Sequence, residues 1–349
     1  MLGALLACLA LVAAGCAFTC PTRGPTIQAA PDTEYYFLMG PFGFQATDFG
    51  LAPEVQAYGG GPWWMPLEEC RIKAEGLKGW PEAYVTARRE GGRLAEVGLW
   101  YGGVICRRFD FRYDTSGRLA ARVDTQYEAR RKGEFVNDWV QRVAGTTPKV
   151  TCVREVGYSW SADGRMATVK ILGVSESPDW GGLSEWPSIR YGTPGQIMET
   201  WQLDADGHIV GVFYDGDVAY SATYDDAGRL LRATGNDGDI DNQYDAQGRL
   251  VETTVKTSSG YSTVFAHGYP DARPPKLPAT GDAYEPHTYV LTHDGSGHIV
   301  RVKADEKSGD VLGRYTVHLK RDGEGRVRRL KIHLSDLLLD LFQGQYVFE

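Results

Sequence analysis

Two tryptophan-containing stretches hold side chains that could act on a carbohydrate. Asp179–Trp186 reads DWGGLSEW, and the stretch from Tyr58 to Pro66 reads YGGGPWWMP. Indole rings stack on sugar faces because both surfaces are flat and apolar. The residues that we consider for ligand binding on this ground are Trp63, Trp64, Trp180 and Trp186.

The first stretch also holds Asp179 and Glu185. A pair of carboxyl groups can act as acid and base in glycoside hydrolysis, so a carbohydrate-active enzyme is one hypothesis for the chain. The alternative is that Trp180 and Trp186 pack against the edge of a sheet. A separation of six residues in a loop does not fix the distance between two carboxyl groups, so we favour the packing role.

Other catalytic motifs are absent from the sequence. It has no Gly-x-Ser-x-Gly and no His-Glu-x-x-His pattern. The alternating acids of NDGDID resemble the start of a calcium-binding loop, but Asn242 and Gly248 stand where such a loop needs Gly and Glu. We therefore predict no catalytic residue, no metal and no cofactor.

The charge balance is acidic, with 37 Lys and Arg against 45 Asp and Glu and a net charge of −8. Nucleic-acid phosphates select for clustered basic residues, which makes a nucleic-acid partner unexpected. Apolar residues make up 42% of the chain, enough for a large packed core.

The first fifteen residues, MLGALLACLALVAAG, are uncharged and apolar. They resemble a bacterial lipoprotein signal peptide (1–15) that ends at Cys16, and they are too short to span a bilayer. The resemblance implies lipidation of Cys16, a tether over 16–33 and a location in the cell envelope, on the outer membrane. An ordinary cleaved secretion signal is the alternative.

Four cysteines follow Cys16 in the exported chain, and an exported protein tends to pair its thiols. They show no Cys-x-x-Cys pattern and no histidine at zinc-like spacing. We expect one or two disulfides, in any of three pairings, among Cys20, Cys70, Cys106 and Cys152.

A seven-letter unit recurs along the chain at intervals of roughly 20–25 residues. It is clearest as YDTSGRL, YDDAGRL and YDAQGRL. These three copies contribute the residues that we assign to structural turns: Tyr113, Asp114, Gly117, Tyr224, Asp225, Gly228, Tyr244, Asp245 and Gly248. Weaker copies place anchor glycines at Gly92, Gly164, Gly195, Gly207, Gly297 and Gly325.

Each letter of the unit suits a β-hairpin. Asp opens a turn by accepting a backbone N–H group, and Gly three residues later takes positive φ. Tyr and Leu belong to the flanking strands, where they can meet across the ladder. Arg or His after Gly can lie along the Tyr ring or reach the turn Asp.

The pattern YDxxGRL at this spacing resembles the YD repeat of the Rhs family, over most of residues 88–330. The resemblance implies an all-β fold, an antiparallel meander of hairpins that forms an open curved sheet. Large Rhs proteins enclose a C-terminal toxin. Only 22 residues follow Val327 here, so we expect a short member without a toxin.

The two halves of the array differ in composition. Residues 34–155 are rich in Trp and Cys, whereas 156–349 hold the cleanest repeats. Five prolines in 270–286 indicate a loop. LSDLLLDLF near the end has the spacing of a short amphipathic helix.

The leading hypothesis is a non-catalytic, lipid-anchored binding or scaffold protein of the cell envelope. Its ligand would be a partner protein or a glycan. A periplasmic immunity lipoprotein against a delivered toxin is a more specific alternative, compatible with the location and the acidic charge.

Overall fold

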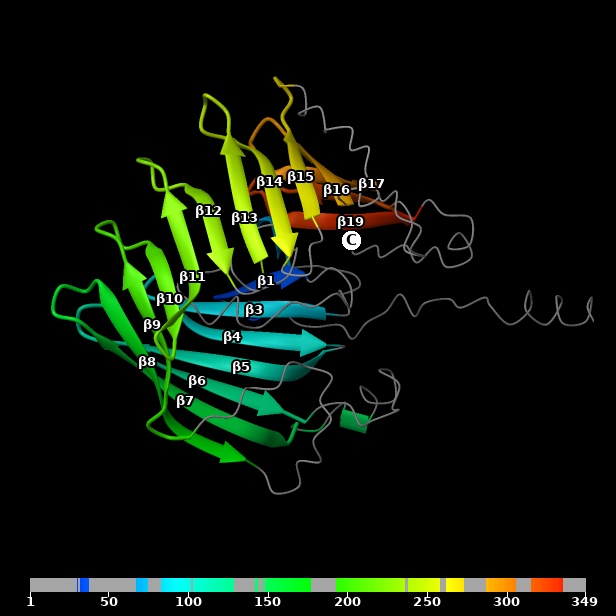
Figure 1. Cartoon of the computed structure of the whole chain (residues 1–349). Helices are drawn as coiled ribbons and strands as arrows, with labels where there is room; N and C mark the ends of the chain where they lie inside the picture. The colour runs from blue at the N-terminus through cyan, green and yellow to red at the C-terminus, as the bar shows by residue number, and fades with distance from the viewer. Residues whose placement is uncertain are drawn as a thin grey trace, which may run out of the picture.

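The fold consists of strands (Figure 1). The computed structural model describes residues 30, 32–37, 67–74, 83–101, 103–128, 142–143, 146, 148–176, 193–235, 238–257, 262–272, 287–305 and 315–334. A 3₁₀ turn, η3 (Leu67–Cys70), precedes the second strand. The strands are β1 (Thr33–Phe37), β2 (Arg71–Ile72), β3 (Ala83–Glu90), β4 (Arg93–Tyr101), β5 (Val104–Tyr113), β6 (Leu119–Tyr127), β7 (Val150–Trp160), β8 (Met166–Glu176), β9 (Ile197–Leu203), β10 (Ile209–Tyr214), β11 (Asp217–Tyr224), β12 (Leu230–Gly235), β13 (Gly238–Tyr244), β14 (Leu250–Thr257), β15 (Ser262–Gly268), β16 (His287–His293), β17 (Ile299–Asp305), β18 (Tyr315–Arg321) and β19 (Val327–Leu334).

All nineteen strands belong to one sheet. From β3 to β15 each strand pairs with the next in antiparallel fashion, and so do β16 to β19. The junction between β15 and β16 is parallel, with Thr263 opposite His287. The meander of hairpins expected from the repeat is therefore present, with one change of direction.

The sheet closes into a ring, which corrects the open sheet expected from the sequence. β1 pairs with β3 over five positions and with β2 over two. β2 then meets β19 in a short parallel contact, where Ile72 lies opposite Val327 and the Lys73 N–H donates to the Val327 carbonyl at 3.0 Å. An open sheet would leave two rows of unpaired backbone groups, and the segment that holds β1 and β2 occupies both edges.

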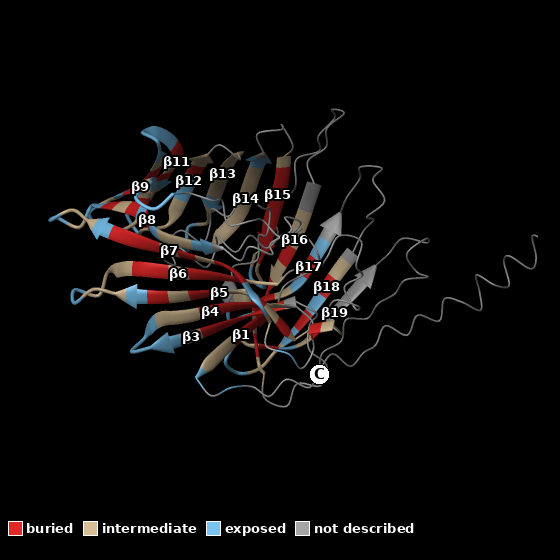
Figure 2. Ribbon diagram, turned by 90° about the horizontal axis from the view of Figure 1, so that it is seen from below, coloured by how far each residue is buried: buried red, intermediate tan, exposed pale blue. Residues whose placement is uncertain are grey.

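The core lies on the enclosed face of this ring. One cluster combines side chains from strands far apart in the sequence, such as Phe109 of β5, Phe265 of β15 and Val317 of β18. A second cluster is centred on Val156, Trp201 and neighbouring strands up to β12. Figure 2 shows buried positions along β6, β7 and β15, and exposed tips where hairpins turn. Opposite walls therefore pack against each other.

Several sequence expectations fall outside this structure. The expected C-terminal helix, the signal peptide and most of the proline-rich loop at 270–286 lie outside the described residues. Within the described part of the chain, no helix has the length and apolar character that a membrane crossing requires.

Glu69 of η3 ties the closing segment to the far side of the ring. Its Oε2 accepts hydrogen bonds from the Ile299 N–H at 2.9 Å and from Arg321 NH2 at 2.7 Å, while Oε1 lies 3.3 Å from His298 Nδ1. Arg321 also donates to the Glu69 carbonyl at 3.0 Å. The Arg321 side chain is buried, so removal of the Glu69 carboxylate would leave a buried charge without its counterion.

We expect Glu69→Ala to lower the free energy of unfolding by about 2–4 kcal/mol, because it leaves the Arg321 guanidinium buried without its carboxylate. Urea denaturation followed by tryptophan fluorescence would measure the change. Glu324→Ala is the matched control, since Glu324 pairs with Arg326 at an exposed turn and its removal should cost less than about 0.5 kcal/mol. Equal effects of the two substitutions would contradict a special role for Glu69.

Candidate functional site

The repeat turn is the unit from which the surface of the ring is built. In the copy that begins at Tyr224, Asp225 Oδ1 accepts from the N–H groups of Ala227 and Arg229, both at 2.9 Å. Its Oδ2 accepts from Arg229 Nε at 2.7 Å. The Gly228 N–H donates to the Asp225 carbonyl at 2.9 Å, and Gly228 has a φ of 74°. One carboxylate thus holds the whole turn.

The same arrangement recurs at the other copies. All of the anchor glycines have positive φ: Gly92, Gly117, Gly164, Gly195, Gly207, Gly228, Gly248, Gly297 and Gly325. The turn carboxylates that accept the N–H group four residues on are Asp114, Asp204, Asp225, Asp245, Asp294 and Asp322. The hydrogen bond from Arg229 lowers the pKa of the Asp225 carboxyl. The Asp225 carboxylate therefore stays ionised to a lower pH than an ordinary aspartate.

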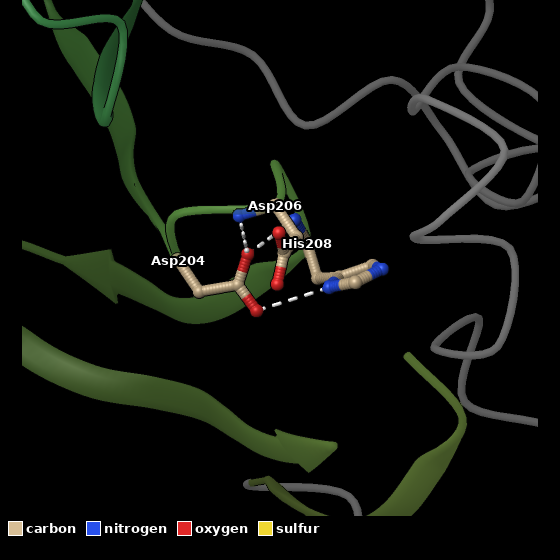
Figure 3. A group of neighbouring side chains, drawn as sticks. All are labelled: Asp204, Asp206 and His208. Carbon is tan, nitrogen blue, oxygen red and sulfur yellow. Dashed lines mark hydrogen bonds and ion pairs between the residues drawn. The ribbon is translucent and has the colours of Figure 1, made fainter. Parts of the chain in front are cut away.

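One turn brings together three side chains that could hold a metal ion, Asp204, Asp206 and His208 (Figure 3). Their geometry is that of the repeat. Asp204 Oδ1 accepts from the Asp206 and His208 N–H groups, both at 2.9 Å, and Oδ2 lies 3.0 Å from His208 Nδ1. His208 also stacks on Tyr224 with ring centroids 4.7 Å apart. These contacts explain the cluster as a turn, with His208 in the place of Arg229.

In six units the first side chain joins that unit to the one before it, whereas Leu203 has no side-chain donor and His293 Nδ1 contacts Gly297 of its own unit. Tyr244 donates its hydroxyl to the Leu230 carbonyl at 2.9 Å, and Leu230 is the last letter of the preceding unit. The equivalent donor and acceptor pairs are Tyr113 to Leu94, Trp160 to Leu119, Tyr224 to Ile209, Tyr269 to Leu250 and Arg321 to Ile299. These bonds form a ladder that runs from unit to unit.

The basic letter of the unit strengthens the same ladder. The Arg229 guanidinium lies 4.8 Å from the centre of the Tyr244 ring, which belongs to the next unit, while it also pairs with Asp225 of its own turn. Arg249 lies in the same way 4.4 Å from the Tyr269 ring. A Cβ atom at Gly248 would collide with Arg229 NH1. The two roles considered for Arg, stacking and pairing with Asp, therefore occur together, and the stacking crosses to the neighbouring unit.

Tyr269 is a member of the ladder that the seven-letter pattern missed. The stretch GYPDA keeps the Tyr and the Asp but loses the Gly-Arg-Leu end of the unit. The Arg of the preceding unit points to Tyr269 as the next member of the ladder. Arg249 stacks on the Tyr269 ring and pairs with Asp271 at 2.7 Å.

A buried arginine cluster lies on the enclosed face at β5, β6 and β7. Asp124 Oδ1 accepts from Arg122 Nε at 2.6 Å, and its Oδ2 lies 2.7 Å from Arg154 Nη2 and 3.9 Å from Arg107 Nη2. The register places Asp124 directly opposite Phe109 and Arg154, and opposite residues share a face of the sheet. The sequence signal was weak: Arg122 and Asp124 are two apart in a strand.

The electrostatics of this cluster favour full ionisation. Burial alone would raise the pKa of Asp124, but Arg122, Arg154 and Arg107 together hold it below its usual value. Burial lowers the pKa of Arg107 to about 10. On the same face Glu199 has a raised pKa because of burial, although Arg122 opposes that shift. With arginines on both oxygens, Asp124 is suited to holding three strands together and is poorly placed to accept a proton from a substrate.

Three of the four cysteines considered for disulfides lie in the described part of the chain, and Cys20 lies outside it. Cys70, Cys106 and Cys152 are buried thiols, and no disulfide joins them to one another. β6 lies between β5, which holds Cys106, and β7, which holds Cys152. Two strand spacings are about 10 Å, beyond the reach of a disulfide. Burial raises the pKa of Cys70 to about 12, so this thiol is unreactive at neutral pH.

Other expected site residues are not placed. Cys16, Cys20, Trp63, Trp64, Trp180 and Trp186 lie outside the described residues, as do Asp179 and Glu185. The tryptophans that are described serve the framework. Trp201 is buried in the second core cluster, and Trp160 donates its Nε1–H to the Leu119 carbonyl at 2.8 Å.

Comparison with known proteins identifies the repeat. The family described as RHS Repeat matches residues 224–263, which hold the two clearest copies and reach into β15. This match confirms the Rhs resemblance of the YDxxGRL pattern. No curated protein matches the sequence.

Three solved structures are similar to parts of the chain. TcdB2-TccC3-TEV aligns with 77% of this chain at 12% identity and a TM-score of 0.27, and the alignment spans 15% of that chain. A porin-like protein from Bacteroides uniformis aligns with 76% of this chain and 89% of its own, at 12% identity and a TM-score of 0.26. A DUF3836 family protein from Parabacteroides distasonis covers 26% of this chain and 74% of its own, at 11% identity and a TM-score of 0.17. The chain thus spans a small part of the first of these structures.

We expect Tyr244→Phe to destabilise the ring by about 0.5–1.5 kcal/mol, because it removes one hydrogen bond of the ladder and keeps the ring beneath Arg229. Tyr244→Leu removes the stacking as well and should cost more. Urea denaturation of the two variants beside the wild type would separate these effects. A Tyr244→Phe variant as stable as the wild type would show that the ladder bond contributes nothing net.

Proposed function

We propose that this chain, which carries Rhs repeats, is a non-catalytic binding or scaffold protein of the bacterial cell envelope. Its ligand in this proposal is a partner protein or a glycan. The observation that carries the proposal is the contrast between a constant frame and variable, exposed turn tips.

The frame is constant because Tyr, Asp, Gly and Arg are engaged in contacts within the ring. The two residues between Asp and Gly lie at the tip of each turn. They are exposed and do not take part in the hydrogen bonds that join one unit to the next. They differ from turn to turn: Thr115 and Ser116, Ala162 and Asp163, Ala205 and Asp206, Asp226 and Ala227, Ala246 and Gln247. Side chains that vary on a rigid scaffold are the usual arrangement of a binding surface.

Neighbouring tips also stand at fixed places relative to one another. Arg229 of one turn reaches both the Tyr244 ring and Gly248 of the next turn. His208 in the same way approaches Gly228. The tips therefore form a row along one rim of the ring, and a row can contact a partner larger than any single turn. Stacked repeat proteins commonly bind through such extended surfaces.

The acids that the structure describes support a role without catalysis. Asp225 and Asp245 are each engaged by an arginine and by backbone N–H groups, and Asp124 is held by arginines. Carboxylates committed in this way stabilise the scaffold. The tips carry Asp163, Asp206 and Asp226, so the contact surface is acidic and suits a partner with basic groups.

The cell-envelope location rests on the N-terminal sequence. The run MLGALLACLALVAAG before Cys16 resembles a lipoprotein signal peptide. In this proposal a lipid on Cys16 holds the chain at the membrane, and the residues that follow allow the ring to stand away from it.

We expect the immobilised full chain to retain one protein, or one glycan, from native envelope extract. The double variant Asp206→Lys/Asp226→Lys should retain much less of that ligand than the wild type. Charge reversal at two adjacent tips should repel a partner with basic groups. Retained material would be identified by mass spectrometry and glycan analysis.

Asp217→Lys is the control for this experiment, because Asp217 is exposed at the opposite end of β11 from the Asp226 tip. Its binding should match the wild type. Equal binding by tip and control variants would remove the rim from the proposal, and turnover of an envelope glycan by the chain would contradict the non-catalytic role.

Cys16→Ala should abolish lipid attachment and release the chain from the membrane fraction, whereas Cys20→Ala should leave it attached. Fractionation of expressing cells and mass spectrometry of the mature N-terminal peptide would test this. A mature chain that begins at another residue, or an unchanged distribution of Cys16→Ala, would refute anchoring at Cys16.

A further inference from the structure

Two buried histidines meet at the one place where the meander changes direction. His267 of β15 and His293 at the end of β16 are 5% and 7% exposed, and the two strands run parallel. His267 Nδ1 lies 3.1 Å from His293 Nε2, and His293 Nδ1 lies 2.8 Å from the Gly297 carbonyl oxygen. The imidazoles therefore form a chain of hydrogen bonds that ends at a repeat turn.

The positions of the imidazole hydrogens follow from these hydrogen bonds. A carbonyl oxygen can only accept, so His293 Nδ1 carries a hydrogen and His293 Nε2 is left as an acceptor. His267 Nδ1 must then be the donor in the contact between the rings. In the neutral pair this bond satisfies both rings. When both imidazoles are protonated, two N–H groups point at each other and the bond between the rings is lost.

The surroundings offer this pair little compensation for positive charge. The Tyr269 ring stacks on His293 with centroids 4.4 Å apart. The Arg249 guanidinium also lies 4.4 Å from the centre of the Tyr269 ring and pairs with Asp245 and Asp271. The charged groups that face His293 are Glu69 of η3, Asp294 of its own turn and Arg321 of β18. Glu69 is already engaged by Arg321, the Ile299 N–H and His298. Among the described residues, no carboxylate accepts a hydrogen bond from His267 or His293.

The pair is connected to the closure of the ring. His293 binds Gly297 at the end of the turn, and the next two residues, His298 and Ile299, contact the Glu69 carboxylate. Glu69 belongs to the 3₁₀ turn directly before β2, which makes the closing contact with β19. A shift of this turn would therefore reach the closing contact through two hydrogen-bonded steps.

We propose that His267 and His293 form an acid-sensitive latch: proton uptake by the pair loosens the β15–β16 junction and, through the 294–298 turn and Glu69, opens the closing contact between β2 and β19. The opened ring would expose the backbone groups of β2 and β19 as edges for pairing with another strand. An envelope protein that meets acidic surroundings would then change from a closed to an open scaffold.

The direction of the pH dependence follows from the burial of both rings. Burial and the neighbouring His293 lower the pKa of His267 from 6.5 to about 4, and burial likewise lowers the pKa of His293. The closed state thus binds fewer protons than the open state. Its stability is complete above about pH 6.5 and is lost as the pH falls from there towards 4. The difference of 2.5 pKa units for His267 corresponds to an opening equilibrium about 300-fold larger at the acid end.

Hydrogen exchange on the full chain between pH 7.5 and pH 4 tests the latch, with rates corrected for the intrinsic pH dependence of exchange. We expect protection to fall by up to about two orders of magnitude in peptides from 262–272, 287–299 and 67–74. Peptides from β7 and β8 should keep their protection over the same range. Equal loss in all regions would show global acid unfolding and would overturn the proposal.

Two variants separate the pair from other titrating groups. His267→Phe removes one imidazole, and His293→Tyr installs the residue that occupies this position in the clearest units. Either should flatten the pH dependence at the junction and at the closing contact. His318→Gln, at an exposed position on β18, should leave it unchanged. A wild-type slope that persists in both folded variants would refute the latch. If neither variant folds, the wild type alone still tests the latch, because the proposal requires that protection be lost at the junction and the closing contact and kept in β7 and β8.

Discussion

The hydrogen bond from the first side chain of one repeat to a backbone carbonyl of the repeat before it is the contact on which this ring depends. In Tyr244 and Tyr269 the bond comes from a phenol, in Trp160 from an indole and in Arg321 from a guanidinium. The donor chemistry varies, whereas the direction of the bond is constant. The first letter of the unit can therefore change among Tyr, Trp and Arg while this contact is kept.

The ladder also explains why one turn can use so few letters. Asp225 fixes its own turn and orients Arg229, and Arg229 then covers the tyrosine of the next unit. Local turn geometry and contact between units are therefore carried by the same two side chains. The two letters between Asp and Gly carry exposed side chains, which places them where a ligand would meet the protein.

Buried charges hold the sheet at two places. At β5 to β7 the enclosed face holds the charges of Asp124, Arg122 and Arg154. At the closing contact, Glu69 and Arg321 play a similar part for a β2 strand of two residues. A contact as short as that between Ile72 and Val327 supplies little hydrogen bonding by itself, and Arg321 adds hydrogen bonds to the Glu69 carbonyl and carboxylate beside it.

The local structure of the turns and their flanking strands follows from the repeat pattern alone. Asp and Gly at fixed spacing require a turn with positive φ, so Gly228 and Gly248 were predictable, as were the strands on either side of them. The role of Tyr244 was predictable only in part, because the pattern shows that an aromatic residue lies in the strand but not which carbonyl it contacts. Three further features depend on how distant strands come together: the closure of the ring, the separation of the cysteine thiols and the convergence of three arginines on Asp124. Each joins residues whose distance along the chain has no period; Ile72 and Val327, for example, meet from opposite ends of the array. Periodicity reports the contacts that every unit repeats, whereas closure is a single contact whose position depends on the curvature accumulated over the whole sheet.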